Sequence, residues 1–293
     1  MTAPTRERET AFEPVYHRYG PHRAGLPPLV PYFRELWHRR GFATEMSRAE
    51  IRGANTKTIL GQAWLVLNPL LLAAVYYLLV TILRGQHDPM VFVHLTLGLF
   101  AFNLVSSSIT SGTKSVVSAG KLLINTAFPR LLIPLSAVRT AVFRFLPTIP
   151  VYLVFHLIFL TRVWSPTMLL SLYFFGCLLV FSAGLAAFFA TMQVYFRDTS
   201  SFLPFFLRLW MYLSPVLWLP EAIVGGNFPR WMLTLIQINP MYSMLGGYAE
   251  AVQESQVPDL SMWITSAAWA VGVAVLGFLF FISREREFAV RLT

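Results

Sequence analysis

The chain has 293 residues, of which 56% are hydrophobic and only 13% are charged, and its formal net charge is +9. Soluble domains carry about 25% charged residues, so this deficit indicates an integral membrane protein. The single cysteine excludes an internal disulfide, and no spacing of cysteine and histidine is typical of a zinc site. We therefore expect neither a metal nor a cofactor on this chain.

The N-terminal part divides into two stretches by composition. Residues 1–31 are polar, contain six prolines and lack the apolar core of a cleavable signal, so we interpret them as a disordered cytoplasmic tail. In residues 32–58, Phe33, Trp37 and Arg40 fall on one helical face, which is typical of an amphipathic helix in the membrane interface. An ordinary solvated basic helix is less favoured, because a long apolar run follows directly.

Residues 59–293 contain six apolar segments, each about long enough to cross the hydrocarbon core of a bilayer. They lie approximately at residues 64–83, 91–110, 134–160, 167–192, 204–219 and 262–282. The fifth is the shortest and contains Arg208. The sequence therefore predicts an all-α integral membrane fold with six transmembrane helices in one domain, residues 59–293.

The placement of lysine and arginine predicts the orientation of these spans. If the N-terminus is cytoplasmic, all but three of the 23 lysines and arginines lie on the cytoplasmic side. The external exceptions are Arg84, Arg162 and Arg230. Because cytoplasmic loops carry the excess of positive charge, both ends of the chain are expected inside.

Residues 113–130, between the second and third spans, form an amphipathic segment. Read as a helix, it has a polar stripe of Lys114, Ser118, Lys121 and Asn125. The opposite, apolar stripe consists of Val116, Val117, Gly120, Leu123 and Ile124. Such a helix lies on a membrane surface or docks into a groove of a partner, and Pro129 ends it.

The region before the last span, residues 220–259, is expected on the external side of the membrane. Its segments 228–238 and 242–251 are too short and too interrupted by proline and glycine to cross. We interpret them as re-entrant or interfacial helices at the external mouth, with a plain interfacial loop as the alternative.

The sequence has no energy source of its own. It lacks a GxxxxGK[ST] phosphate loop, and between Pro89 and Arg197 it contains no aspartate or glutamate. Without a neighbouring acid, His94 and His156 are interpreted as packed core histidines rather than proton relays. ATP hydrolysis and carboxylate catalysis by the spans are therefore not expected.

Aromatic residues make up 15% of the chain and gather in two spans. The first span contains Tyr76 and Tyr77, and the fifth has a ridge of Phe202, Phe206 and Trp210. Aromatic faces can stack on sugar rings, which would suit a polysaccharide conduit. For any single ring, packing against lipid or core is the alternative.

Four stretches within residues 32–293 resemble, in order and spacing, the transmembrane subunits of type-2 ABC exporters of lipid-linked polysaccharides. The matching residues are Leu60, Gly61, Trp64 and Pro69 in LGQAWLVLNP; Asn125, Phe128, Pro129, Arg130 and Pro134 in LINTAFPRLLIPL; Tyr195, Phe196, Arg197 and Asp198 in VYFRDT; and Ser214, Pro215, Asn239 and Pro240 in YLSPVLW and INPMYSML. By itself the Arg197–Asp198 pair is also compatible with a solvated loop.

The resemblance implies a homodimer in the bacterial plasma membrane that works with two copies of an ABC ATPase, which bind ATP and Mg. Residues 113–127 would be the coupling helix, contacting the ATPase through Lys114, Val117, Ser118, Lys121 and Asn125. The interface helix would flank the substrate entrance. The conduit would be lined by Tyr76, Tyr77, Phe202, Phe206 and Trp210, and the external gate would include Pro215, Asn239 and Pro240.

The sequence most resembles the actinobacterial exporter of lipid-linked galactan, a precursor in cell-wall biogenesis, and is related to the O-antigen and teichoic acid exporters. One alternative is a type-2 permease that exports drugs or small lipids. Another is a membrane-embedded glycosyl- or phosphotransferase, whose acids would be Glu221, Glu250, Glu254 and Asp259. A nucleic-acid binder is set aside, because the arginines flank the spans and follow the inner leaflet.

Overall fold

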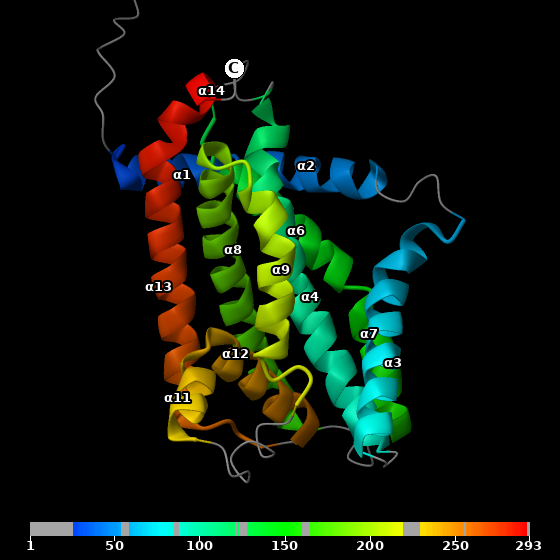
Figure 1. Ribbon diagram of the computed structural model, residues 1–293. Coiled ribbons are helices and arrows are strands. Elements are labelled where there is room, and N and C mark those ends of the chain that lie inside the picture. Colours follow the sequence, from blue (N-terminus) through cyan, green and yellow to red (C-terminus); the bar gives the residue numbers. More distant parts are fainter. Residues whose placement is uncertain are drawn as a thin grey trace, which may run out of the picture.

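The computed structural model describes residues 26–53, 59–84, 88–120, 122, 128–159, 165–218, 229–254 and 256–291, and every regular element in these ranges is a helix. In chain order the helices are α1 (Leu29–His38), α2 (Arg40–Gly53), α3 (Trp64–Arg84), α4 (Pro89–Ser118), α6 (Leu132–Phe145), α7 (Thr148–Phe159), α8 (Ser171–Tyr195), α9 (Thr199–Tyr212), α11 (Arg230–Ile238), α12 (Pro240–Ala249), α13 (Leu260–Arg284) and α14 (Phe288–Arg291). Figure 1 shows the long helices running side by side.

Five segments are long and apolar enough to cross a membrane, and they confirm five of the six predicted spans. They are Gly61–Ile82, Pro89–Ser118, Leu132–Phe159, Pro166–Tyr195 and Leu260–Glu287. The third consists of two helices, α6 and α7, which meet at Leu146 and Pro147. The break follows from the proline, which has no backbone N–H to donate into the helix. The chain is a multi-pass membrane protein.

The predicted fifth span, residues 204–219, does not reach the length of a span. Its helix, α9, has 14 residues and ends at Tyr212. At 1.5 Å per residue it is about 21 Å long, against a hydrocarbon thickness of about 30 Å. Turns follow from Leu213 to Val216, since Pro215 disfavours helical geometry at Ser214. Six spans are therefore not found in the part of the chain that the structure describes.

The predicted interface helix is two helices rather than one, and α1 begins at Leu29, inside the stretch predicted as tail. The remainder of that tail, residues 1–25, lies outside the described residues. The break at Arg39 comes just before Gly41, a residue that destabilises helices. Figure 1 shows α1 and α2 lying across one end of the long helices, as an amphipathic pair at an interface would.

Helices α4, α8 and α13 pack closely through small residues. Helices α8 and α13 approach most closely at Gly184 and Gly277, where a β-carbon on Gly277 would collide with the carbonyl of Gly184. On the other side of α8, the contact of Gly112 with Ala186 brings α4 close. Small residues thus replace bulky side chains where three backbones meet, which is the usual way of packing helices in membranes.

The two ends of the bundle differ in content. One end carries α1, α2, α14 and the termini of α4 and α8, while the opposite end carries α11 and α12 (Figure 1). The latter two helices match the predicted segments 228–238 and 242–251 to within a few residues. The segments predicted to be cytoplasmic therefore gather at one end.

Candidate functional site

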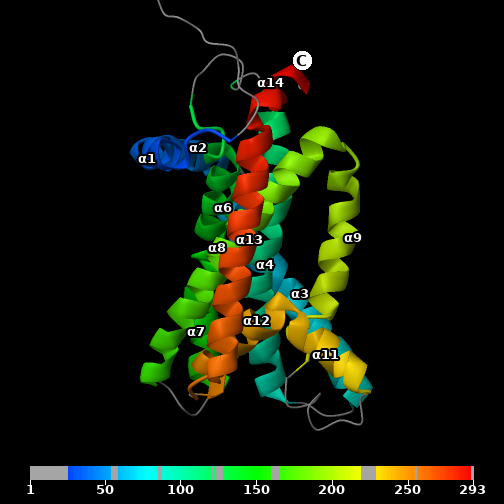
Figure 2. The ribbon, with the colours of Figure 1, turned by 90° about the vertical axis from the view of Figure 1, so that its left-hand side faces the viewer.

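A cleft of about 880 Å³ separates α3 and α9 on one flank of the bundle. Helix α4 forms its inner wall, and Figure 2 shows α9 running along one flank of the bundle. Leu203, Leu207 and Met211 of α9 pack into the hydrophobic core beside the cleft. The structure brings Trp64 and Pro69, two residues of the first matched motif, into this wall. The cleft is therefore built from the first span and from α9, the two elements that the sequence assigns to a conduit.

The lining of the cleft is mixed in chemistry. Apolar side chains alternate with neutral polar groups from α3 and α4 and with two arginines, Arg144 and Arg208. The neutral polar residues are Asn68, Asn103, Ser106, Ser107 and Thr110. No aspartate or glutamate belongs to the described lining. Such a surface can both donate and accept hydrogen bonds, and it carries positive charge.

Of the five aromatic residues predicted to line a conduit, only Tyr76 lines this cleft. Its hydroxyl group lies 3.2 Å from that of Tyr212, so the pair links α3 to the end of α9. Tyr77 instead packs edge-on against Phe92 of α4. Phe206 and Trp210 pack against the hydrophobic core, and Phe202 is exposed outside the cleft. Phe202, Phe206 and Trp210 contact one another along α9, but Phe206 and Trp210 face α8. Trp210 also bonds Asn239, the residue before α12.

Gly61 forms the turn through which the chain enters α3. Its φ of +50° is a left-handed conformation that glycine adopts without strain. A short 3-10 turn, η1 (Gly61–Ala63), then leads directly into Trp64. The Leu-Gly pair thus sets the angle at which α3 leaves the end of the bundle where α2 lies.

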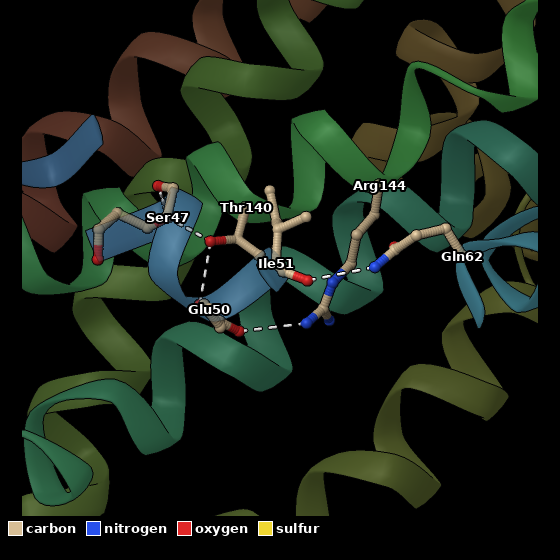
Figure 3. A network of polar contacts seen from close by, with 7 residues as sticks. Ser47, Glu50, Ile51, Gln62, Thr140 and Arg144 are labelled. Carbon is tan, nitrogen blue, oxygen red and sulfur yellow. Dashed lines mark hydrogen bonds and ion pairs between the residues drawn. The ribbon is translucent and has the colours of Figure 1, made fainter. Parts of the chain in front are cut away.

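A polar network joins α2 to α6 beside the cleft (Figure 3). The hydroxyl of Ser47 donates to the carbonyl of Ser136 at 2.9 Å. One oxygen of Glu50 accepts from the hydroxyl of Thr140 at 3.0 Å, and the other pairs with the guanidinium of Arg144 at 3.2 Å. Sequence reasoning missed this network, because its partners are about 90 residues apart.

A second cavity, of about 560 Å³, lies on the other side of this network. It is enclosed by α2, the end of α4 and the start of α6, and both Glu50 and Lys114 line it. The Glu50–Arg144 pair therefore joins the linings of the two cavities, because Arg144 belongs to the first and Glu50 to the second.

The predicted coupling helix does not begin at residue 113. Helix α4 continues without a break to Ser118, so Lys114, Val117 and Ser118 belong to its last turns. These three are exposed, whereas Val116, which was expected on the same apolar stripe as Val117, is buried. Lys121, Leu123, Ile124 and Asn125 lie outside the described residues.

The residues after that segment are anchored to both ends of the chain. Phe128 packs on Phe42 of α2, with ring centroids 4.9 Å apart, and Pro129 is buried. The guanidinium of Arg130 donates to the backbone carbonyl of Glu285, just after α13. Arg130 thus links the chain before α6 to the end of α13.

Tyr32 in α1 completes this junction. Its hydroxyl donates to the carboxylate of Glu285 at 2.7 Å and accepts from the backbone N–H of Leu131 at 3.4 Å. Burial, together with the neighbouring carboxylate, raises the pKa of the Tyr32 hydroxyl, which therefore stays protonated and able to donate. On the outer face of α1, Phe33 and Trp37 are exposed and the guanidinium of Arg40 lies 4.3 Å from the centre of the Trp37 ring.

The turn from α8 into α9 is fixed by Gln193 rather than by the Arg197–Asp198 pair. The side-chain amide of Gln193 donates to the carbonyl of Arg197 at 3.0 Å, and its oxygen accepts from the backbone N–H of Ser200 at 2.7 Å. Arg197 and Asp198 are exposed and form no ion pair with described residues. These two side chains therefore fit the interpretation as a solvated loop pair.

At the opposite end, Asn239 connects α9 to α12. Its side-chain oxygen caps α12 by accepting from the N–H of Met241 at 3.0 Å and also accepts from the indole N–H of Trp210 at 2.9 Å. Its amide donates to the carbonyl of Leu213 at 3.0 Å, two residues before Pro215. Pro240 occupies the first helical position, where a missing N–H costs nothing.

The two histidines are buried, as predicted. His94 donates to the side-chain oxygen of Gln253 at 3.1 Å, and the amide of Gln253 donates to Tyr152 at 3.2 Å. Gln253 lies in η3 (Glu250–Glu254), a π-helical turn after α12. Of the acids proposed for an enzyme, Glu221 lies outside the described residues, and no cluster suited to a metal occurs among those described.

Comparison with known proteins places this geometry in context. No model of a protein family matches the chain. An O-antigen export system permease protein RfbA of Myxococcus xanthus is 29% identical over 263 residues, which cover 89% of this chain and 99% of the relative. Two proteins of the same name from Klebsiella pneumoniae are 32% identical over 193 residues (64% of this chain, 71% of the relative) and 29% identical over 199 residues (66% and 73%).

All three relatives are named as permeases, which are components of transport systems rather than enzymes. These names set aside the interpretation as a glycosyl- or phosphotransferase. The chain belongs to the family of O-antigen export permeases.

Proposed function

We propose that this chain is the membrane subunit of an ATP-driven, ABC-2-type exporter, which moves a lipid-linked polysaccharide from the cytoplasm across the plasma membrane. Two copies would assemble with two copies of a separate ATPase. The named relatives support a permease of a polysaccharide export system. The sequence supports a separate ATPase, because it contains no phosphate-binding loop.

The cleft between α3, α4 and α9 is the observation that carries this proposal. Its amide and hydroxyl groups can pair with sugar hydroxyls, and Trp64 and Tyr76 offer aromatic faces to the apolar side of a sugar ring. Within this class, a galactan-like cell-wall polymer is our proposed substrate and an O-antigen-like polymer is the close alternative.

The end of the bundle that carries α1, α2 and α14 would face the cytoplasm. Its described arginines and lysine greatly outnumber those at the opposite end, in accord with the positive-inside rule. The exposed residues Lys114, Val117 and Ser118 would meet the ATPase there, together with Lys121 and Asn125 of the segment that follows.

A second copy of the chain would close the open side of the cleft. Helix α9 is too short to cross the hydrocarbon core alone, and Phe202, Phe205 and Leu209 leave its outer face apolar and exposed. In a homodimer this face would be covered, and two clefts would together form one conduit with gates built from α11 and α12.

Co-purification with the ATPase encoded beside the chain tests the proposal. We expect a complex of two permeases and two ATPases, and accumulation of lipid-linked glycan when the permease is depleted. Lys114→Glu should lower coupled ATP hydrolysis, whereas charge reversal at the exposed Arg48 of α2 should not. Failure to form the complex would refute the proposal, and drug sensitivity without glycan accumulation would favour the drug-efflux alternative.

A further inference from the structure

Two arginines share the cleft with no carboxylate in its described lining. Arg208 is the tenth residue of α9, and its exposed side chain forms no hydrogen bond or ion pair with a residue that the structure describes. Arg144 lies near the end of α6, inside the candidate span Leu132–Phe159. A charged side chain within a membrane span is costly, so an uncompensated one indicates a functional site.

Arg144 is only partly compensated. One terminal nitrogen of its guanidinium pairs with Glu50 at 3.2 Å, while its Nε atom is buried without a hydrogen-bond partner. A guanidinium offers five donors in a rigid plane, and the Glu50 contact satisfies only a part of them. The remaining donors belong to a side chain that lines the cleft.

We infer that Arg144 and Arg208 form a binding subsite for a phosphate or pyrophosphate group inside the cleft. This inference rests on the proposed function and names the part of a lipid-linked substrate that the subsite would hold. Planar, bidentate guanidinium donors match phosphate oxygens well. The neighbouring amide and hydroxyl groups of Asn103 and Ser107 add neutral donors that pair with an anion without competing charge.

Glu50 competes with a bound phosphate for Arg144. Because it binds Arg144 from the side of the second cavity, a phosphate in the cleft and the Glu50 carboxylate compete for the same guanidinium. An anion that draws Arg144 away weakens one of the contacts that hold α2 on α6. Occupation of the subsite is thereby linked to the position of α2.

Binding of a radiolabelled polyprenyl pyrophosphate tests the inference. The full chain with its ATPase would be placed in phosphatidylcholine nanodiscs, without nucleotide, and titrated with farnesyl pyrophosphate. Arg208→Gln and Arg144→Gln should each weaken binding about tenfold or more, as expected for loss of a charge-assisted hydrogen bond. Arg139→Gln, which removes an exposed arginine of α6 that lies on Phe143, is the matched control and should bind like the wild type.

Glu50→Gln separates a ligand-binding role from a structural one. If the anion competes with Glu50, this variant binds several-fold more tightly than the wild type, opposite in sign to Arg144→Gln. If Arg144 serves only to hold α2, the two variants shift affinity in the same direction, and the inference is overturned. Arg208→Lys, which keeps the charge, should recover part of the affinity and so guards against misfolding of the glutamine variant.

Competition identifies the source of the phosphate. Farnesol, which has no phosphate, should not displace the label. Displacement by inorganic pyrophosphate alone, or by phosphatidylglycerol as well as farnesyl pyrophosphate, would assign the subsite to any phosphate rather than to an isoprenoid-linked one. A wild-type complex that exports glycan but binds none of these probes overturns the subsite and leaves the exporter proposal standing. A chain that binds the pyrophosphate but recruits no ATPase supports the subsite and refutes the exporter proposal.

Discussion

Asn239 contacts more structural elements than any other residue that the sequence assigned to the external gate. Its side chain caps α12, accepts from Trp210 of α9 and donates to the backbone after α9. The bonds to Trp210 and Met241 are half-buried, so they are best kept within the protein, whereas the bond to the carbonyl of Leu213 is exposed. The gate assignment of Asn239 stays a prediction, but its structural role at this end is clear.

Asn239→Ala should therefore destabilise the protein. Losing a cap costs about 1 kcal/mol, and losing the half-buried hydrogen bond from the indole of Trp210 costs about 1 kcal/mol more, so we expect a loss of about 2 kcal/mol. Thermal denaturation in detergent would measure it. Asn239→Asp keeps the acceptor and loses the donor, so it should cost less; equal losses for the two variants would contradict this account.

Tyr32 is the residue that fastens α1 to the far end of the chain. Tyr32→Phe removes the bonds to Glu285 and Leu131 while keeping the ring, which should cost about 1–3 kcal/mol locally because a buried carboxylate loses a donor. Hydrogen exchange in α1 should speed up in this variant. Trp37→Phe, on the exposed face of the same helix, is the control, and unchanged exchange in Tyr32→Phe would show that other contacts hold α1.

At the scale of elements, the backbones of α8 and α13 touch, because Gly184, Gly277 and Ala274 leave no side chain to hold them apart. Gly277→Ala places a methyl group against the carbonyl of Gly184, and overpacking of this kind costs about 1–3 kcal/mol. Unfolding in a titration with sodium dodecyl sulfate should shift accordingly. Gly272→Ala, on the same helix with open space around it, should be neutral or slightly stabilising.

Helix α2 is the element whose function depends most on its neighbours. Its contacts to α6 through Ser47 and Glu50 fix it across the end of the bundle, between the two cavities. Since Arg144 is shared between this attachment and the cleft, α2 is placed to respond to what the cleft contains. A helix that only floated in the interface would need no such partners.

At the scale of the whole molecule, the distribution of arginine and lysine between the two ends predicts the topology. In a Cys177→Ala background, a cysteine introduced at the exposed Trp231 of α11 should react with a membrane-impermeant maleimide on intact cells. Val117→Cys, at the other end, should react only after permeabilisation. The opposite labelling pattern would reverse the orientation proposed here.

The sequence by itself determined the membrane class, five spans, the interface segment and both short helices before α13. These features depend on local properties, namely the length and hydrophobicity of each segment and the positions of proline and glycine. The matched motifs also pointed to α3 and α9, and Trp64 and Pro69 do line the cleft that these helices border.

Only the tertiary structure decided what these elements do together. The continuation of α4 to Ser118 and the inward turn of Phe206 and Trp210 depend on packing against distant helices. The pairing of Glu50 with Arg144 joins residues 94 positions apart. No periodicity within one segment encodes such a contact, because its energy arises only when the fold brings the two side chains together.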